Sequence, residues 1–412
     1  MTQSQPTRRK LLLQAAGMGL TVDLLARQAF ADTEHSMASR KFVFINCRGG
    51  MDGMTISPPV GDPDYVGLRG KIALGDEALN LDSTFSLHPA MTASHGLARA
   101  GQLRIAPAIA TPDRARSHFE AQDVLESGAP TQYGATSGWL NRALVALKSQ
   151  RKIEAISIGT TAPLILKGTY EVASWSPGRG MGSETRLPGL LQDLYRNDPL
   201  LGPALARGLS TEDMATAAMS AMSAPSAPQA SGTGTQAYAR QGAAVAERLG
   251  RSVAAILTEP GGPQIAAMSL DAFDTHANQG AAEGQLANRL ASLDALIGGL
   301  QSGLGASWAS TVVVVATEFG RTARVNGTGG TDHGTASTAL VLGGSLKPGG
   351  IIGDWPGLKP AALYENRDLA PTLDMRSLFK SVLGDHMGLD LLALSTRVFP
   401  DSAAIKPVSG LV

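Results

Sequence analysis

The stretch "STVVVVATEF" (Ser310–Phe319) decides the fold class of this chain. It places four consecutive valines after a Ser-Thr pair and carries no charged residue before the glutamate near its end. β-Branched side chains pack well on a pleated sheet, and an apolar run without polar alternation is typical of a strand buried on both faces. We therefore predict that this stretch is a central strand of a sheet that is covered on both sides.

Similar runs recur along the chain and alternate with helical patterns. The stretch Gly284–Leu304 has leucines at three- and four-residue spacing, which is typical of an amphipathic helix, and another helix is expected to begin near Ser117. This alternation predicts an α/β fold with a mostly parallel central sheet and helices on both faces. The other predicted strands are Lys41–Asn46, Leu103–Ala110, Glu154–Gly159, Gln264–Leu270 and Ser337–Gly344.

Residues 174–250 interrupt this alternation. The segment is rich in Ala, Ser, Met, Gly and Pro, and its second half has little periodicity. Such a composition predicts a partly helical cap inserted into the domain, with a flexible segment around Ala224–Gly234. We expect residues 40–412 to form a single α/β hydrolase-like domain that carries this inserted helical cap.

The N-terminal residues 1–31 have the pattern of an export signal. The paired arginines Arg8 and Arg9 precede a mildly apolar run, and Ala29-Phe30-Ala31 matches an A-x-A cleavage pattern. The arginine pair indicates the twin-arginine route, while a basic leader of the general secretory route is the alternative. We expect the protein in the periplasm or outside the cell, with any metal acquired before export.

Charge and composition exclude several classes of partner. The full chain has a net charge of zero, and removal of residues 1–31, which hold four basic residues and one acid, would leave −3. That charge argues against nucleic acid or an anionic membrane surface as a partner. The one cysteine, Cys47, excludes an internal disulfide framework. No later segment reaches the roughly 18 apolar residues of a membrane-spanning helix.

Polar side chains collect just after the predicted strands. In sheets of this kind, ligands bind beyond the carboxyl ends of the strands. Asp and neutral His are the oxygen and nitrogen ligands that zinc, manganese and iron accept, so these loops predict a site for one or two divalent transition metal ions. The candidate residues are Asp52, Ser117, His118, Glu120, Asp274, His276, Glu318, Arg321, Asp332 and His333.

The metal ligands divide into two predicted groups. Asp274 and His276 would serve one ion, while Asp52 with Asp332 and His333 would serve the second. Adjacent residues such as Asp332 and His333 reach one side of a site only from a loop, since on a strand they point to opposite faces. The surrounding glycines allow such a loop.

Some candidates also have a purely structural interpretation. Asp52 stands between glycine-rich residues and is a common type of turn residue. Ser117 and Glu120 fit an S-x-x-E capping box, although a helix N-terminus also favours an anionic group. Glu318 and Arg321 would pair with each other at a strand end if neither contacts substrate.

The chain resembles the secreted proteins grouped as domain of unknown function 1501. The resemblance covers Lys41 to Leu394, and members of that family usually carry twin-arginine-like leaders. The stretches that carry it are, in order, "RGGMDG", "SHFEAQDVLESG", "GWLNR", "FDTHANQ", "EFGRT", "GTDHG" and "LVLGGSLKPGGIIGDWPGL".

That family in turn resembles the alkaline phosphatase superfamily, which includes sulfatases, through the "DHG" at Asp332–Gly334. The resemblance implies a three-layer sandwich and two metal ions, one held by Asp52, Ser117, Asp332 and His333, the other largely by Asp274 and His276. The superfamily commonly has a further metal-binding histidine shortly after the Asp-His pair. This sequence departs from that pattern, because the only histidine after His333 is His386. It also has no C/S-x-P-x-R motif, so a formylglycine mechanism is not expected.

The resulting prediction is an exported metal-dependent hydrolase of phosphate or sulfate esters, acting on a small-molecule or glycan ester. The nucleophile would be Ser117 or a metal-bound water, assisted by His118, Glu120 and Arg321, and Arg116 and Glu318 would bind substrate. The alternative is a non-catalytic secreted protein that keeps the fold and binds a surface glycan or an envelope protein.

Overall fold

The computed structural model describes residues 37, 39–148, 154–159, 162–177, 187–199, 201–221 and 235–412. Contacts between residues divide the chain into a unit of residues 1–40 and a unit of residues 41–412. The predicted signal peptide and the predicted flexible segment at 224–234 lie outside the described residues. The second unit carries the elements described below.

The second unit is built on a large, mostly parallel sheet. Its strand order is β10-β4-β9-β8-β1-β7-β5-β6, and β9 alone of these strands runs antiparallel to both neighbours. A short antiparallel pair, β2 and β3, forms a second sheet. The strands are β1 (Lys41–Cys47), β2 (Leu79–Asn80), β3 (Ser86–Leu87), β4 (Leu103–Ala110), β5 (Ala155–Ile158), β6 (Ala173–Trp175), β7 (Ile265–Leu270), β8 (Thr311–Ala316), β9 (Ser337–Leu342) and β10 (Leu373–Asp374).

The valine run forms β8 in the interior of the sheet, as predicted. β8 pairs with β1 on one side and with β9 on the other, and all of its residues are buried. It ends at Ala316, earlier than the predicted Phe319, and the next residue contacts the loop after β1: the Oγ1 of Thr317 accepts a hydrogen bond from the Met51 amide at 2.9 Å. The residues after β8 therefore belong to a loop.

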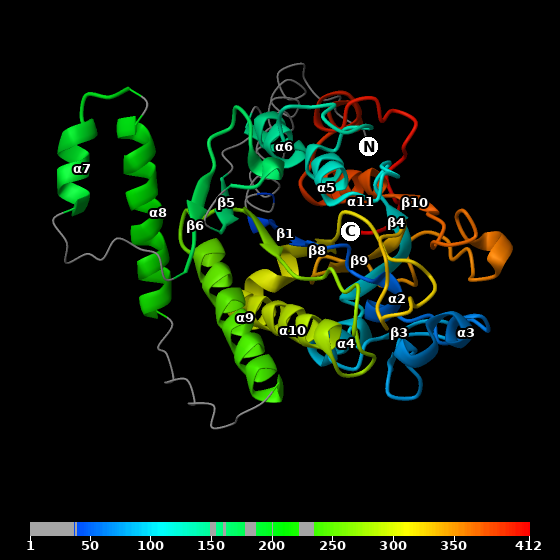
Figure 1. The fold of residues 1–412 in the computed structure, drawn as a ribbon. Helices are drawn as coiled ribbons and strands as arrows, with labels where there is room; N and C mark the ends of the chain where they lie inside the picture. The colour runs from blue at the N-terminus through cyan, green and yellow to red at the C-terminus, as the bar shows by residue number, and fades with distance from the viewer. Residues whose placement is uncertain are drawn as a thin grey trace, which may run out of the picture. The chain divides into compact units, whose positions relative to one another are not determined.

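Helices cover both faces of the sheet, which confirms the predicted layers. Successive residues of β1 enter different cores: Val43 packs with one apolar cluster, and Phe44 packs with the other. The first cluster includes side chains of α4, α9 and α10, and the second includes side chains of α5, α6 and α11 (Figure 1). The longer helices are α4 (Thr92–Arg99), α5 (His118–Ser127), α6 (Trp139–Lys148), α7 (Leu187–Tyr195), α8 (Leu201–Ala221), α9 (Thr235–Thr258), α10 (Gln285–Leu304) and α11 (Met375–Ser381).

Short helical turns connect these layers. The short α-helices are α2 (Gly53–Ile56), α3 (Tyr65–Arg69) and α12 (Leu391–Ala393), and the 3₁₀ and π turns are η1 (Gly70–Ile72), η2 (Leu164–Leu166), η3 (Gly305–Ser310), η4 (Pro360–Ala362), η5 (Val382–His386) and η6 (Leu394–Val398).

The predicted cap region contains β6, α7, α8 and the start of α9. β6 is the edge strand beside β5, and α8 packs against β6 and α9 (Figure 1). The region is therefore helical where it is described, but β6 also extends the central sheet. Among the described residues, no helix is both long enough and apolar enough to cross a membrane.

The reversed direction of β9 determines where the site forms. The other strands of the main sheet run parallel to one another, so their carboxyl ends meet at one edge. Because β9 runs the opposite way, its first residue, Ser337, lies at that same edge and not at the far one. The loop that precedes β9, with Asp332 and His333, therefore meets the loops that follow β1, β4, β7 and β8.

Candidate functional site

Three metal-ligating side chains converge at this edge of the sheet. One ligand atom from each of His118, Asp274 and His333 lies within 4.8 Å of the others. His118 begins α5, Asp274 follows β7, and His333 precedes β9. Three segments that are distant in sequence thus place two imidazoles and one carboxylate around a single point.

His276 lies directly beside this group. Its Nε2 is 3.0 Å from the Nε2 of His333 and 3.0 Å from the Oδ1 of Asp274. The Nε2 of His333 lies 3.3 Å from the same Oδ1, and the Nε2 of His118 lies 3.4 Å from the Oδ2 of Asp274. We call these four residues, His118, Asp274, His276 and His333, the histidine cluster.

The donor set of the histidine cluster fits a transition metal. Zinc binds imidazole nitrogen and carboxylate oxygen at about 2.0–2.1 Å in a tetrahedral arrangement. The ligand atoms of His118, Asp274 and His333 lie within 4.8 Å of one another, so the three side chains can share one ion. Imidazole and carboxylate together are also ligands for manganese and iron.

A backbone carbonyl fixes the orientation of His333. Its Nδ1 lies 2.8 Å from the carbonyl oxygen of Arg116, and because a carbonyl only accepts, Nδ1 carries the proton. In the neutral ring, Nε2 then presents its lone pair to Asp274 and His276. Burial lowers the pKa of His333, despite the opposing hydrogen bond to Arg116. Burial thus favours the neutral form, and the Arg116 carbonyl fixes the tautomer in which Nε2 is free to ligate.

The carboxylate of Glu318 fixes the orientation of His118. The Oε1 of Glu318 lies 2.8 Å from the Nδ1 of His118 and also accepts the backbone amides of Gly49 and Gly50, at 2.8 and 3.2 Å. Burial alone would raise the pKa of Glu318, but these hydrogen bonds, led by that of His118, lower it overall. The hydrogen bond to Glu318 in turn raises the pKa of His118.

Arg321 holds Asp274 from behind. Its Nη2 contacts the Oδ1 of Asp274, while its other hydrogen bonds go to backbone carbonyls. Burial alone would raise the pKa of Asp274, but the hydrogen bond and charge of Arg321 lower it overall, helped by His276 and His118. The Arg321 side chain is 0% exposed and holds Asp274, and its predicted catalytic role stays a prediction. The carbonyl acceptors of Arg321 belong to Gly49, Gly50, Phe273 and Thr331.

Asp332 lies behind His276, on the side away from the other cluster residues. Its Oδ1 is 3.2 Å from the Nδ1 of His276 and accepts the side-chain amide of Asn326 at 3.1 Å. Burial alone would raise the pKa of Asp332, but the hydrogen bonds of Asn326 and His276 lower it overall. Asp332 therefore contacts an imidazole of the cluster, and the direct ligand role that the sequence predicts for it stays a prediction.

Two glycines let the loops approach closely enough to form the cluster. Gly49 adopts a φ of +116°, and a Cβ there would lie 2.6 Å from the backbone nitrogen of Asp274. At Gly334, next to His333, a Cβ would lie 2.4 Å from the backbone carbon of Arg321. The glycines of "RGGMDG" and "GTDHG" are thus required by backbone packing.

Asp52 belongs to a separate buried network. It is 1% exposed and caps α2, and its carboxylate pairs with the guanidinium of Arg69, which is 0% exposed. The Oδ2 of Asp52 also accepts the Oγ1 of Thr55 at 3.0 Å and the Nε2 of Gln279 at 2.7 Å. The turn interpretation of Asp52 agrees with this arrangement, and a metal role for it stays a prediction that would require Arg69 to move.

Ser117 caps α5 only through its backbone. Its carbonyl accepts the Ala121 amide at 2.9 Å, whereas its Oγ bonds to the Glu120 carboxylate in place of the amide of a capping box. No hydrogen bond among the described residues joins that Oγ to the histidine cluster. The roles predicted for Ser117 and Glu120 stay predictions.

The side chain of Arg116 turns away from the cluster. Its Nε lies 2.8 Å from the Oδ2 of Asp368, and its Nη2 contacts Glu365. Asp368 is 0% exposed and also accepts the Oγ1 of Thr335 at 2.9 Å and pairs with Arg367 at 2.9 Å. Arg116 thus supports His333 through its backbone, while its predicted substrate contact stays a prediction.

Sequence reasoning did not single out several of these supporting residues. Asn326, Asp368 and Arg69 stand in none of the quoted motifs, and Gln279, although it ends "FDTHANQ", was not singled out; only their position in the fold gives these residues a role. His386 shows the opposite case: its Nε2 lies 2.9 Å from the Lys41 carbonyl at the start of β1, so it cannot supply a late ligand to the cluster.

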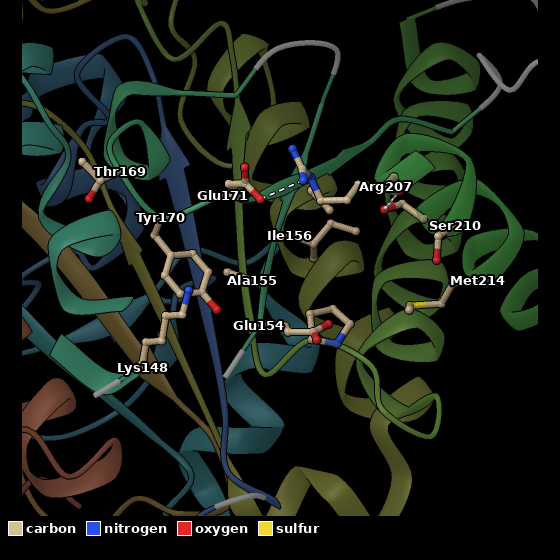
Figure 2. Close-up of a pocket in the computed structure, with 13 residues that line it drawn as sticks. Lys148, Glu154, Ala155, Ile156, Thr169, Tyr170, Glu171, Arg207, Ser210 and Met214 are labelled. Atoms are coloured by element: carbon tan, nitrogen blue, oxygen red, sulfur yellow. Dashed lines mark hydrogen bonds and ion pairs between the residues drawn. The ribbon is translucent and has the colours of Figure 1, made fainter. Parts of the chain in front are cut away.

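The cavities in the described part of the chain include one beside Asp332 and one near β5 and β6. A cavity of about 450 Å³ is lined by Asp332 and Asn326, among others. A second, of about 500 Å³, lies between β5, β6 and α8, far along the strand order (Figure 2). There Arg207 pairs with Glu171 at 2.8 Å, and the Lys148 ammonium lies 5.5 Å from the centre of the Tyr170 ring. None of the predicted site residues lines the second cavity.

The fold and the cluster define an α/β protein with a histidine–carboxylate centre beyond the carboxyl ends of its strands. The chain belongs to the family described as protein of unknown function (DUF1501), whose model matches residues 39–395. This confirms the family predicted from the sequence motifs. No curated protein matches the chain.

Solved structures resemble the chain only weakly. A protein of the alkaline phosphatase superfamily from Vibrio parahaemolyticus has 12% sequence identity to this chain and a TM-score of 0.32. The match covers 76% of this chain and 63% of the other. The lipoteichoic acid synthase LtaP from Listeria monocytogenes has 8% identity, coverage of 88% and 76%, and a TM-score of 0.34. Ps i-CgsB has 9% identity, coverage of 89% and 77%, and a TM-score of 0.38.

Proposed function

We propose that this protein is a metal-dependent hydrolase of phosphate or sulfate esters. The observation that carries the proposal is the convergence of His118, Asp274 and His333, whose ligand atoms lie within 4.8 Å of one another. Three protein ligands that leave a position open to water or substrate are the usual form of a catalytic metal site. A divalent transition metal held there would supply Lewis-acid stabilisation of the charge that develops on the ester oxygens.

The residues behind the ligands preorganise this centre. The Arg116 carbonyl and the Glu318 carboxylate each hold the Nδ1 of an imidazole, so both rings present Nε2 to the centre. Such supporting hydrogen bonds typically raise metal affinity 10- to 100-fold. Arg321 holds the Asp274 carboxylate in its ionised form.

His276 is suited to proton transfer beside the metal ligands. Its Nδ1 faces the Asp332 carboxylate at 3.2 Å, so the other nitrogen, Nε2, is the one that accepts a proton at the centre. In the proposed reaction, the oxygen of a water molecule bonds to phosphorus or sulfur, and the Nε2 of His276 takes its proton. The bond to the alcohol oxygen breaks, and the departing alkoxide takes a proton from solvent.

The reaction would take place outside the cytoplasm if residues 1–31 act as the export signal that their sequence predicts. Ester substrates available there include small molecules and glycan esters, the two classes that the sequence favours. This assignment rests on the twin arginines Arg8 and Arg9 and the A-x-A pattern before residue 32.

The test combines metal analysis with an ester panel. Protein purified from the cytoplasm is expected to contain stoichiometric transition metal and to cleave p-nitrophenyl phosphate or p-nitrophenyl sulfate. His333→Ala should lose both properties, whereas His95→Ala on α4, outside the histidine cluster, should keep both. Absence of metal from the wild-type protein would defeat the proposal. Metal without turnover would favour the non-catalytic binding protein instead.

A further inference from the structure

The cavity of about 450 Å³ is lined in part by Asp332 and Asn326, the two residues that contact His276. None of the four cluster residues lines it, so the cavity lies on the Asp332 side of His276. It lies between the loop after β8 and the segment around η4. Its apolar wall consists of Leu68, Val325, Pro360 and Leu363.

The lining of this cavity is cationic. Arg324 and Arg367 both line it, against one acid, Asp332. Asp332 already accepts hydrogen bonds from its neighbours, and the Arg367 charge helps to lower its pKa. The lining therefore has an excess of positive charge beside Asp332, the residue that contacts His276.

The guanidinium of Arg324 has no partner of its own. It is exposed, and it makes no hydrogen bond or ion pair with any residue in the part of the chain that the structure describes. Arg367 pairs with Asp368, but that buried carboxylate also binds Arg116 and Thr335. The side-chain donors of Arg324, and those of Arg367 that do not bind Asp368, therefore remain for a ligand.

We propose that this cavity binds a second anionic group of the ester, so that the natural substrate carries a further sulfate, phosphate or carboxylate besides the group that is hydrolysed. The guanidinium of arginine can donate two parallel hydrogen bonds to a pair of oxygens on any of these three groups. The apolar wall suits the ring or chain that joins the two groups, and the volume lies within the usual range for ligand sites. The inference rests on the proposed hydrolase function.

Binding of two aryl phosphonates tests the inference without requiring turnover. One is phenylphosphonate, and the other carries an additional carboxylate on its ring; affinities are measured by calorimetry on the metal-loaded full chain. We expect the carboxylated compound to bind about three- to tenfold more tightly, as for an accessible charge-assisted pair. Arg324→Gln should remove that preference and leave the affinity for phenylphosphonate unchanged.

A matched variant controls for the loss of one positive charge. Arg289→Gln removes an exposed arginine from α10, which does not line the cavity, and should keep the preference. Equal affinity for both phosphonates in the wild-type protein would overturn the inference, as would a preference that survives Arg324→Gln. If neither a phosphate nor a sulfate ester is cleaved while the preference holds, the hydrolase proposal fails and the anion site stands.

Discussion

The Nδ1 of His333 lies 2.8 Å from the carbonyl oxygen of Arg116, a residue 217 positions earlier in the chain. Arg116 adopts a φ of +57°, an uncommon conformation for a residue other than glycine that aims its carbonyl at the ring. Its side chain is held by Asp368 and Glu365. The ion pairs of Arg116 thus maintain the backbone geometry that orients a proposed metal ligand.

Replacement of Arg116 should therefore weaken metal binding although its side chain touches no ligand atom. Arg116→Ala removes both ion pairs, and we expect the metal dissociation constant to rise about 10- to 100-fold, as for loss of other supporting contacts. Titration with zinc under competition from a chelator measures this. Arg114→Ala, an exposed neighbour, is the control; an unchanged constant for Arg116→Ala would contradict the role.

The two imidazoles of the metal-free protein should titrate on opposite sides of the ordinary histidine pKa. The Glu318 hydrogen bond raises the pKa of His118, and burial lowers that of His333. Because a raised pKa means that the folded state binds the proton more tightly, the stabilisation from His118 is complete below about pH 6.5 and is lost as pH rises through its folded pKa.

NMR titration of the ring signals measures both pKa values, with His333→Gln and His118→Gln for assignment. Denaturation at several pH values measures the linkage. The stability advantage of the wild-type protein over His118→Gln should shrink as the pH rises from 6 towards 8. An advantage that grows over this interval would contradict the assigned charge state of His118.

The buried pair of Asp52 and Arg69 should be important for folding. Arg69→Met leaves a carboxylate that is 1% exposed without its cation, and removal of one partner from such a pair typically costs about 3–5 kcal/mol in the free energy of unfolding. Urea denaturation measures that loss. Arg289→Met, on the exposed face of α10, should change stability little.

A substitution of Asp52 itself tests whether this residue is a metal ligand. Asp52→Asn should lower stability but keep stoichiometric metal in the folded fraction, because Asp52 contacts Arg69, Thr55 and Gln279 and not the histidine cluster. Loss of metal from a variant that remains folded would instead make Asp52 a ligand and would require Arg69 to move.

Ser117→Ala distinguishes the two nucleophiles that the sequence leaves open. Because the Oγ of Ser117 bonds to Glu120, we expect the variant to keep its metal and to retain turnover within a few-fold of the wild-type protein. Steady-state kinetics with p-nitrophenyl phosphate measures this. A loss of about 10³-fold or more, with a phosphorylated Ser117 trapped in the wild-type protein, would show that the serine attacks the ester.

The strands were predictable because their local signal is strong. The valines of β8 and the apolar run of β1 predict buried strands from composition alone, and both strands lie in the interior of the sheet. The direction of β9 carries no such signal, since an apolar strand reads alike in parallel and antiparallel pairing. Short strands such as β10 depend on the tertiary structure and were not found.

The site was predictable as a set of loops but not as a set of roles. The sequence predicts that His118 is catalytic, whereas its Nε2 lies 3.4 Å from the Oδ2 of Asp274, a position that also suits a metal ligand. Arg321 appeared available to substrate, yet its donors are used by backbone carbonyls and by Asp274. Such roles depend on side-chain direction and burial, which one sequence does not encode locally.

The histidine cluster draws its members from loops that are brought together only when β4, β7 and β9 are in place. A metal held there would bind the folded chain far more tightly than the unfolded chain, and binding of that kind stabilises the folded state by RT ln(1 + [L]/Kd). A shortage of metal would then increase the unfolded population and also remove the activity of the proposed metal centre. The cellular lifetime of the protein, measured against proteases, should follow the metal supply.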